Sequence, residues 1–210
     1  MRKTFLFDLD GTLIDTPPLI ISTFVETFEH FFKDLKFDYE TLTTFLGQTL
    51  FKTFRNYTDD EELVDQMVSY YRKKSEEKIN SQLNAFDNAV KTLKTLKEQG
   101  HNVGIVTSKM KAVATSHLDK TGLLPYVDLV IGYEDVIEHK PSPEGLLKAV
   151  DYFNAEKERT YYVGDHEHDL LSAKNADIKA ILVAYSLRLI EGIKTNPDLV
   201  ISDLFDLTEM

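Results

Sequence analysis

Residues 4–15 are Thr-Phe-Leu-Phe-Asp-Leu-Asp-Gly-Thr-Leu-Ile-Asp, a short apolar run that ends in two acids and a glycine. An apolar run closed by glycine is typical of a strand buried on both faces, as in parallel sheets. Residues two apart on an extended chain point to the same side, so Asp8 and Asp10 should converge while Leu9 faces away. Two carboxylates this close repel unless a cation or a shared proton relieves them. The stretch therefore indicates a cation site with a nucleophilic acid, or else a simple turn, where Asp and Gly are common.

The chain beyond residue 83 alternates between short apolar runs and amphipathic stretches. This alternation is typical of an α/β fold in which a Rossmann-like parallel sheet core carries helices on both faces. We expect strands at residues 102–107, 128–131, 161–163, 180–183 and 199–201, and helices at residues 89–98, 110–120, 143–153 and 169–176.

Residues 17–82 differ, because their apolar side chains recur at helical rather than strand spacing. Phe24, Phe28 and Phe31 stand three or four positions apart, the spacing of one helix face. We therefore expect two to four helices here, inserted into the sheet domain as an α-helical cap domain. The expected division is a catalytic core of residues 1–16 and 83–210 and a cap domain of residues 17–82.

Composition excludes several classes of function. The 210 residues include no cysteine, which rules out disulfides, thiolate zinc sites and cysteine nucleophiles. The formal net charge of −11 argues against nucleic acid as a partner, since phosphate backbones are bound by basic surfaces. The apolar runs are too short for a signal peptide or a membrane span, so no membrane association is expected. We expect a cytoplasmic monomer or weak dimer that binds a small phosphorylated molecule through a metal ion and local cations.

Polar side chains follow several of the predicted strands. Thr107 and Ser108 end one strand, where hydroxyls and backbone amides either hold phosphate oxygens or simply cap the next helix. Lys140 lies in a proline-rich loop, either as a fixed charge for a phosphoryl group or as a solvated lysine. Gly11 would let backbone amides approach a phosphate. Ligands bind at the carboxyl ends of parallel strands, so these residues are expected to meet in space.

The segment Gly164-Asp165-His166-Glu167-His168-Asp169 follows another predicted strand. Asp165 is a candidate ligand for a hard cation, and Asp169 is placed to orient Lys140 or to complete the outer shell of the metal. The alternative for Asp169 is an acid favoured by the dipole at a helix N-terminus. Because the other candidate ligands are oxygens, we expect Mg²⁺ rather than zinc or manganese, and a solvent- or substrate-facing role for His166 and His168.

The order of these motifs resembles that of the haloacid dehalogenase superfamily. Its phosphatases carry Asp-x-Asp-Gly-Thr, a strand ending in Thr or Ser, a Lys, and Gly-Asp-x-x-x-Asp. The matching residues here are Asp8-Leu9-Asp10-Gly11-Thr12, Thr107, Lys140 and Gly164-Asp165 to Asp169. The resemblance runs from the first strand to about Tyr185, and the first motif is its most specific part. It implies a Rossmann-like core with a helical cap inserted after the first motif.

The resemblance also implies a mechanism through an aspartyl-phosphate intermediate, with Asp8 as the nucleophile. Mg²⁺ would be held by Asp8, the backbone carbonyl of Asp10 and Asp165. Asp10 would protonate the leaving group and then deprotonate the water that hydrolyses phospho-Asp8. The dehalogenase branch lacks this second acid, so Asp10 indicates phosphate rather than halide chemistry.

In the same resemblance, Thr107 and Lys140 would grip the phosphoryl group during its transfer. The phosphate site would further include three residues of the neighbouring loops: Gly11, Thr12 and Ser108.

Residues 104–109, 139–144 and 163–165 are similar to the phosphoglycolate phosphatase group, and particularly to its Gram-positive relatives that hydrolyse inorganic pyrophosphate. The leading expectation is hydrolysis of a small, phosphoglycolate-like metabolite, with pyrophosphate as the close alternative. A phosphosugar mutase would use the same two aspartates. A non-catalytic phosphate-binding protein is a further alternative, although binding alone needs no paired carboxylates.

In the cap, Gly47-Gln48-Thr49-Leu50 is expected to form a loop that faces the substrate. Gln48 is the candidate contact to the substrate. Lys52 and Arg55 are expected either as contacts to an anion or as residues of a solvated helix face.

Overall fold

The computed structural model describes residues 1–46, 48–186 and 193–210. The chain divides into two compact units, one of Met1–Asp15 with Asn84–Met210 and one of Thr16–Leu83. The first unit is built around a sheet, and the described residues of the second form four helices.

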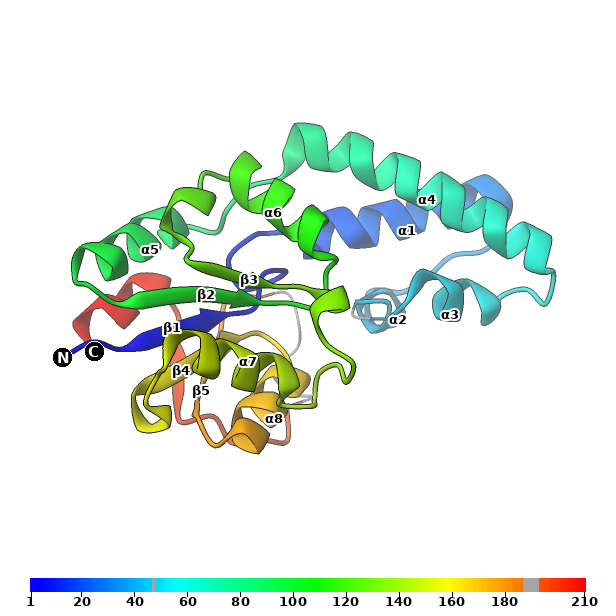
Figure 1. Ribbon diagram of the computed structural model, residues 1–210. Coiled ribbons are helices and arrows are strands. Elements are labelled where there is room, and N and C mark those ends of the chain that lie inside the picture. Colours follow the sequence, from blue (N-terminus) through cyan, green and yellow to red (C-terminus); the bar gives the residue numbers. More distant parts are fainter. Residues whose placement is uncertain (47, 187–192) are drawn as a thin grey trace. The chain divides into compact units, whose positions relative to one another are not determined.

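The sheet is parallel, and its six strands lie in the order β3-β2-β1-β4-β5-β6. The strands are β1 (Thr4–Phe7), β2 (Asn102–Val106), β3 (Leu129–Ile131), β4 (Thr160–Gly164), β5 (Lys179–Val183) and β6 (Leu199–Ile201). Strand β1 therefore lies at the centre, between β2 and β4 (Figure 1). The residues that directly follow these three strands are neighbours at one edge of the sheet, which is where ligands bind in parallel sheets.

Helices cover both faces of the sheet, α5 (Ala89–Glu98) and α6 (Lys111–Lys120) on one and α7 (Glu144–Phe153) and α8 (Glu167–Ala176) on the other (Figure 1). The predicted α/β fold with a Rossmann-like sheet is confirmed. Short 3₁₀ segments complete the described elements of this unit, at Leu124–Tyr126, Tyr133–Asp135, Lys157–Arg159 and Leu204–Glu209.

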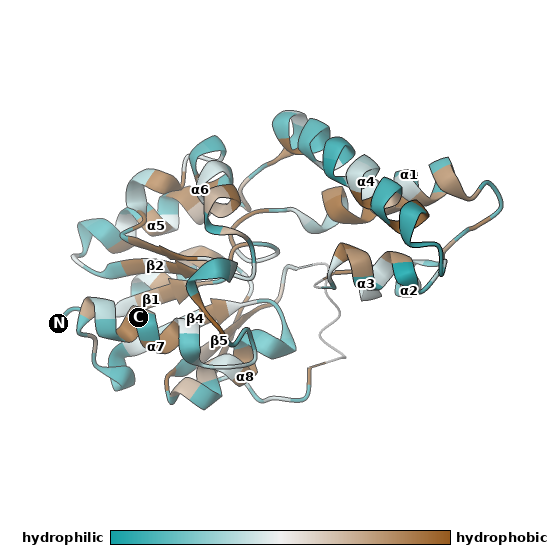
Figure 2. Cartoon of the chain, turned by 45° about the vertical axis from the view of Figure 1, so that its right-hand side comes forward, coloured by the Kyte–Doolittle hydropathy of each residue, from teal (hydrophilic) through white to brown (hydrophobic). Residues whose placement is uncertain are grey.

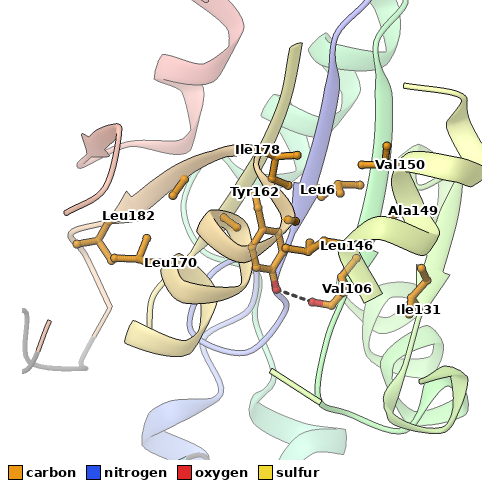
Figure 3. Close-up of a cluster of buried hydrophobic side chains, with 13 residues drawn as sticks. Leu6, Val106, Ile131, Leu146, Ala149, Val150, Tyr162, Leu170, Ile178 and Leu182 are labelled. Atoms are coloured by element: carbon orange, nitrogen blue, oxygen red, sulfur yellow. Dashed lines mark hydrogen bonds between the residues drawn. The ribbon is translucent and has the colours of Figure 1, made fainter. Parts of the chain in front are cut away.

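Alternate residues of each strand face opposite sides of the sheet. Leu6 of β1 and Tyr162 of β4 point to the face covered by α7 and α8, where they join a buried cluster with Val106, Leu146 and Leu170 (Figure 3). Burial of side chains on both faces explains why the strand sequences are continuously apolar.

Helix α8 begins at Glu167, two residues before the expected start. Its first turn is closed by a capping box. The ring of His166 accepts a hydrogen bond from the backbone N–H of His168, and the carboxylate of Asp169 accepts one from the backbone N–H of His166. Asp177 ends the helix in the left-handed conformation, with φ of +59°.

The helical unit comprises α1 (Pro17–Phe31), α2 (Tyr39–Thr44), α3 (Leu50–Arg55) and α4 (Glu61–Gln82). Its core is mainly aromatic: Phe24, Phe28, Phe45, Phe54, Val64, Met67, Val68 and Tyr71 are buried together. Helix α4 is largely hydrophilic, with apolar residues only at helical spacing (Figure 2). Within the described residues, helices that combine the length and the apolar character needed to cross a membrane are absent.

Candidate active site

Asp8 directly follows the central strand and contacts a buried lysine. Lys140 Nζ lies 2.8 Å from Oδ1 of Asp8 and 2.8 Å from Oδ1 of Asp169. The side chains of Lys140 and Asp8 are only 12% and 10% exposed. Lys140 is therefore a fixed, buried charge and not the solvated loop lysine that the sequence also allowed.

Burial shifts the pKa of both partners. Burial is the main reason that the pKa of Asp8 is raised; Lys140 opposes the shift, and Asp169 and Asp10 add to it by repulsion. Burial alone would lower the pKa of Lys140, but the carboxylates of Asp169 and Asp8 outweigh it and the net shift is upward. Lys140 thus stays protonated at pH 7, and further positive charge nearby would favour the ionised form of Asp8.

A third carboxylate completes a buried acidic group at this edge of the sheet. One oxygen each of Asp8, Asp165 and Asp169 lie within 4.8 Å of one another. Three carboxylates are more negative charge than Lys140 balances, and an all-oxygen donor set suits a hard divalent cation such as Mg²⁺. The residues therefore fit the metal that the sequence implied. Asp10 lies outside this group of three, and its proposed ligation through the backbone carbonyl stays a prediction.

Two glycines give the backbone room to approach these acids. Gly11 has φ of +83°, and a Cβ atom at this position would collide with the carboxylate of Asp165. A Cβ atom on Gly164 would collide with the side chain of Asp169. The first motif therefore requires glycine at position 11 for its backbone conformation and also for its closeness to the acidic group.

The position of Asp169 agrees with both alternatives that the sequence left open, and its role in the reaction stays a prediction. Besides Lys140, its carboxylate accepts a hydrogen bond from the backbone N–H of His166 at 3.0 Å, in the first turn of α8. His166 Nδ1 in turn accepts from the backbone N–H of His168 at 3.2 Å, so this ring nitrogen is used to cap the helix. The predicted solvent- or substrate-facing role of the two histidines stays a prediction.

The loop that carries Lys140 is anchored on both sides. Glu144 accepts hydrogen bonds from the backbone N–H groups three and two residues before Lys140, at 3.1 and 2.8 Å. Asn175 Nδ2 donates to the carbonyl of the residue after Lys140 at 2.9 Å. A hydrogen bond from Lys148 and those two backbone N–H groups lower the pKa of Glu144 to about 2, so Glu144 is ionised at pH 7.

The candidate phosphate contacts surround the same edge of the sheet. Thr107 is buried and accepts a hydrogen bond from the backbone N–H of Lys109 at 3.3 Å, whereas Ser108 is exposed. Thr12 is fully buried, and its hydroxyl lacks a hydrogen-bond partner among the described residues. The carbonyl of Thr12 accepts from the hydroxyl of Tyr185 at 2.6 Å.

Tyr162 belongs to this site although the sequence did not single it out. Its hydroxyl donates to the carbonyl of Val106 at 2.7 Å, as Figure 3 shows, and lies 3.3 Å from Oδ1 of Asp169. Lys140 Nζ lies 5.2 Å from the centre of its ring. Tyr162 pairs with Leu6 of β1, two residues before Asp8, so this placement depends on the register of the strands and gave no signal in the sequence.

Two further contacts were not expected. Lys109 Nζ lies 3.0 Å from Oδ2 of Asp10. Ser186 Oγ donates to Oδ2 of Asp165 at 2.7 Å. Both residues follow strands of the sheet, so the strand-end argument applied to Thr107 and Asp165 also covers them.

The expected cap residues have partners within the helical unit. Gly47 lies outside the described residues. Gln48 Nε2 donates to the carbonyl of Thr44 at 2.7 Å. Arg55 forms an ion pair with Glu61 at 2.8 Å. Substrate contact by Gln48, Lys52 or Arg55 stays a prediction.

A family model for haloacid dehalogenase-like hydrolases matches residues 5–183 of the chain. The chain belongs to the haloacid dehalogenase-like hydrolases. Two proteins with curated names are similar to this chain over nearly its whole length. Pyrophosphatase PpaX of Halalkalibacterium halodurans is 38% identical over 99% of this chain and 96% of its own length. Pyrophosphatase PpaX of Bacillus mycoides is 35% identical over 98% of this chain and 94% of its own length.

The haloacid dehalogenase fold is also seen in solved structures. One, a predicted phosphoglycolate phosphatase from Haemophilus somnus, matches with a TM-score of 0.86 at 21% identity, over 99% of this chain and 97% of that one. At this identity the likeness shows the shared fold. The predicted enzyme class, a phosphatase of the haloacid dehalogenase superfamily, is thus confirmed.

Proposed function

We propose that this haloacid dehalogenase-like hydrolase is a Mg²⁺-dependent phosphohydrolase that cleaves inorganic pyrophosphate through a phosphoryl group carried on Asp8. The observation that carries the proposal is the buried group in which Lys140 contacts both Asp8 and Asp169, beside Asp165. A protein that only binds phosphate needs cations and amides, and buried carboxylates would repel its ligand. A carboxylate held beside a lysine at a strand end instead suits nucleophilic attack.

In the first step an oxygen of Asp8 attacks phosphorus, and the bond from phosphorus to the leaving oxygen breaks. The electron pair of that bond stays on the leaving oxygen, which takes a proton from Asp10. In the second step Asp10 accepts a proton from water while the water oxygen attacks phosphorus. The bond to Asp8 then breaks and its carboxylate is restored. Lys140 stabilises the charge on the phosphoryl oxygens in both steps.

The metal would be held by Asp8, Asp165 and the backbone carbonyl of Asp10. When bound, Mg²⁺ supplies positive charge that offsets the phosphoryl oxygens and the buried carboxylates. The donor set described above supports this assignment, because it is made of oxygens and carries excess negative charge. Thr107 and the loop amides from Gly11 onward, with Thr12 and Ser108, would bind the remaining phosphoryl oxygens.

Pyrophosphate is favoured because the curated relatives that match nearly the whole chain are named pyrophosphatases. Phosphoglycolate-like metabolites are the second candidate, supported by the sequence similarity at residues 104–109 and 139–144. In both cases the leaving group is itself an anion. The cap role of residues 17–82 stays a prediction.

The test is phosphate release from pyrophosphate, phosphoglycolate, a phosphosugar and a nucleotide, with Mg²⁺ and with a chelator. We expect Mg²⁺-dependent turnover with a preference for pyrophosphate, lowered by about 10³-fold or more in Asp8→Asn. Asp59→Asn, on an exposed residue of the helical unit, should leave turnover unchanged. Isomerised phosphosugar without free phosphate would indicate a mutase, and absence of turnover on every compound would contradict the proposal.

A further inference from the structure

Lys109 places a cation beside Asp10, the proposed proton donor to the leaving group. Its Nζ lies 3.0 Å from Oδ2 of Asp10, and the two side chains are 17% and 19% exposed. Lys140 contacts Asp8 and Asp169 instead. The site thus has one lysine beside the nucleophile and a second one beside the proposed proton donor.

The backbone of Lys109 is held in place from both sides. Its N–H donates to the hydroxyl of Thr107 at 3.3 Å, and its carbonyl accepts from the backbone N–H of Tyr133 at 2.8 Å. Two residues on, the backbone of Lys111 packs so closely on Gly132 that a Cβ atom at Gly132 would collide with it. The Lys109 side chain therefore starts from a fixed point two residues after Thr107, the proposed phosphate contact.

The buried histidine near Lys109, His117, adds no positive charge to the site. Burial and the charge of Lys109 lower the pKa of His117 to about 4, so His117 is neutral at pH 7. The acids close to the site, Asp8, Asp165 and Asp169, would repel any anion that approaches without a cation to receive it.

In the proposed function, Asp10 delivers its proton to the leaving oxygen, so the leaving group must lie against Asp10 and hence against Lys109. A neutral alcohol leaving group has no need of an ammonium group there. A phosphate or carboxylate on the leaving group would gain a charge-assisted hydrogen bond from Lys109.

We propose that Lys109 binds the negative charge of the leaving group and so selects substrates whose leaving group is itself an anion, such as pyrophosphate. This inference rests on the proposed function, since it takes Asp10 as the proton donor. Lys109 is then a residue that determines specificity. It moves from Asp10 to the leaving group when substrate binds, and this frees Asp10 for proton transfer.

The alternative is that Lys109 only orients Asp10. An orienting residue would affect every substrate alike, because Asp10 serves each of them, whereas a binding residue would affect anionic leaving groups alone. The two roles are therefore separated by comparing substrates that differ in the charge of the leaving group.

The experiment measures kcat and KM with Mg²⁺ for pyrophosphate and for phenyl phosphate, whose leaving group is neutral. We expect Lys109→Met to lower kcat/KM for pyrophosphate by about 10- to 100-fold, mainly through KM, and to change that for phenyl phosphate by less than about threefold. Lys109→Arg should recover most of the loss, because it restores the charge. Lys111→Met, at an exposed lysine that pairs with Asp135, is the matched control and should change neither.

An equal fall for both compounds, or no fall for either, in Lys109→Met would overturn the inference and leave the proposed function standing. Absence of turnover by the unaltered enzyme on both compounds would instead contradict the proposed function itself. Thermal unfolding of Lys109→Met checks that the variant is folded before its kinetics are compared.

Discussion

The ammonium group of Lys140 lies 2.8 Å from Oδ1 of Asp8, in surroundings from which water is largely excluded. Charge–charge attraction is strong in such surroundings, so this contact helps to orient Asp8 and places a cation where it would stabilise a phosphoryl group on that residue. The loop bonds made by Glu144 and Asn175 fix the position from which Lys140 reaches Asp8.

Replacing Lys140 should impair the chemical step. We expect Lys140→Met to lower kcat by about 10³-fold or more, because a preorganised charge on the phosphoryl oxygens is lost. Lys33→Ala, at an exposed lysine of the helical unit, should keep full turnover. Steady-state phosphate release checks both variants, and a Lys140→Met enzyme with more than about a tenth of normal kcat would exclude the role of Lys140 in catalysis.

Tyr162 should act as a positioning residue for Lys140 and Asp169. Tyr162→Phe removes the hydroxyl that lies 3.3 Å from Asp169 and keeps the ring beneath Lys140. We expect kcat to fall about tenfold with KM little changed, and the free energy of unfolding to fall by about 1 kcal/mol as the hydrogen bond to Val106 is lost.

Tyr161→Phe provides the control, since Tyr161 lies on the opposite face of the same strand and stacks on Phe5. Kinetics and urea unfolding of the two variants check the prediction. Equal effects on kcat, or a change in KM alone for Tyr162→Phe, would assign the Tyr162 hydroxyl a purely structural role.

Gly11 and Gly100 form a matched pair, because both have φ of +83° but only Gly11 lies against another residue. Gly100→Ala should cost about 1–2 kcal/mol of stability from backbone conformation alone and keep activity. Gly11→Ala adds a collision with the Asp165 carboxylate, so it should also abolish Mg²⁺-dependent turnover.

Urea unfolding and phosphate release measure both effects of the glycine variants. If Gly11→Ala were no more harmful to turnover than Gly100→Ala, the close approach of Gly11 to Asp165 would not matter for the metal site.

Stability should depend on pH through His117. The pKa of its ring is lowered to about 4 in the folded chain, mainly by burial, from an ordinary value of 6.5. The unfolded chain binds this proton first as pH falls, so His117 should reduce the free energy of unfolding progressively between about pH 7 and pH 4, by up to about 3 kcal/mol.

A His117→Gln variant lacks this titration and should lose less stability over the same interval. The difference between the two proteins isolates His117, because the carboxylates titrate in both. Identical pH profiles in urea unfolding would show that His117 takes up its proton equally well in the folded chain.

The sequence predicted the core of the candidate site because its geometry follows from strand order. Asp8, Thr107 and Asp165 each follow a strand, and parallel strands end at one edge of the sheet. The fold could be predicted for the same reason, since alternating helices and strands leave few other arrangements.

The supporting contacts could not be predicted, because they depend on packing between segments far apart in the chain. The place of Lys109 near the site follows from its position after β2, but its pairing with Asp10 depends on the packing of β1 beside β2. The early start of α8 arises from side-chain capping by His166, which spacing of apolar residues does not reveal.

The central claim, that Asp8 carries the phosphoryl group, is tested most directly by acid quenching during turnover of pyrophosphate with Mg²⁺, followed by mass spectrometry of the peptides. The account predicts that the peptide containing Asp8 gains the mass of one phosphoryl group, that fragmentation places it on Asp8, and that Asp8→Asn abolishes it. Full turnover with no phosphorylated peptide at any quench time, or with the label on another residue, would contradict the account.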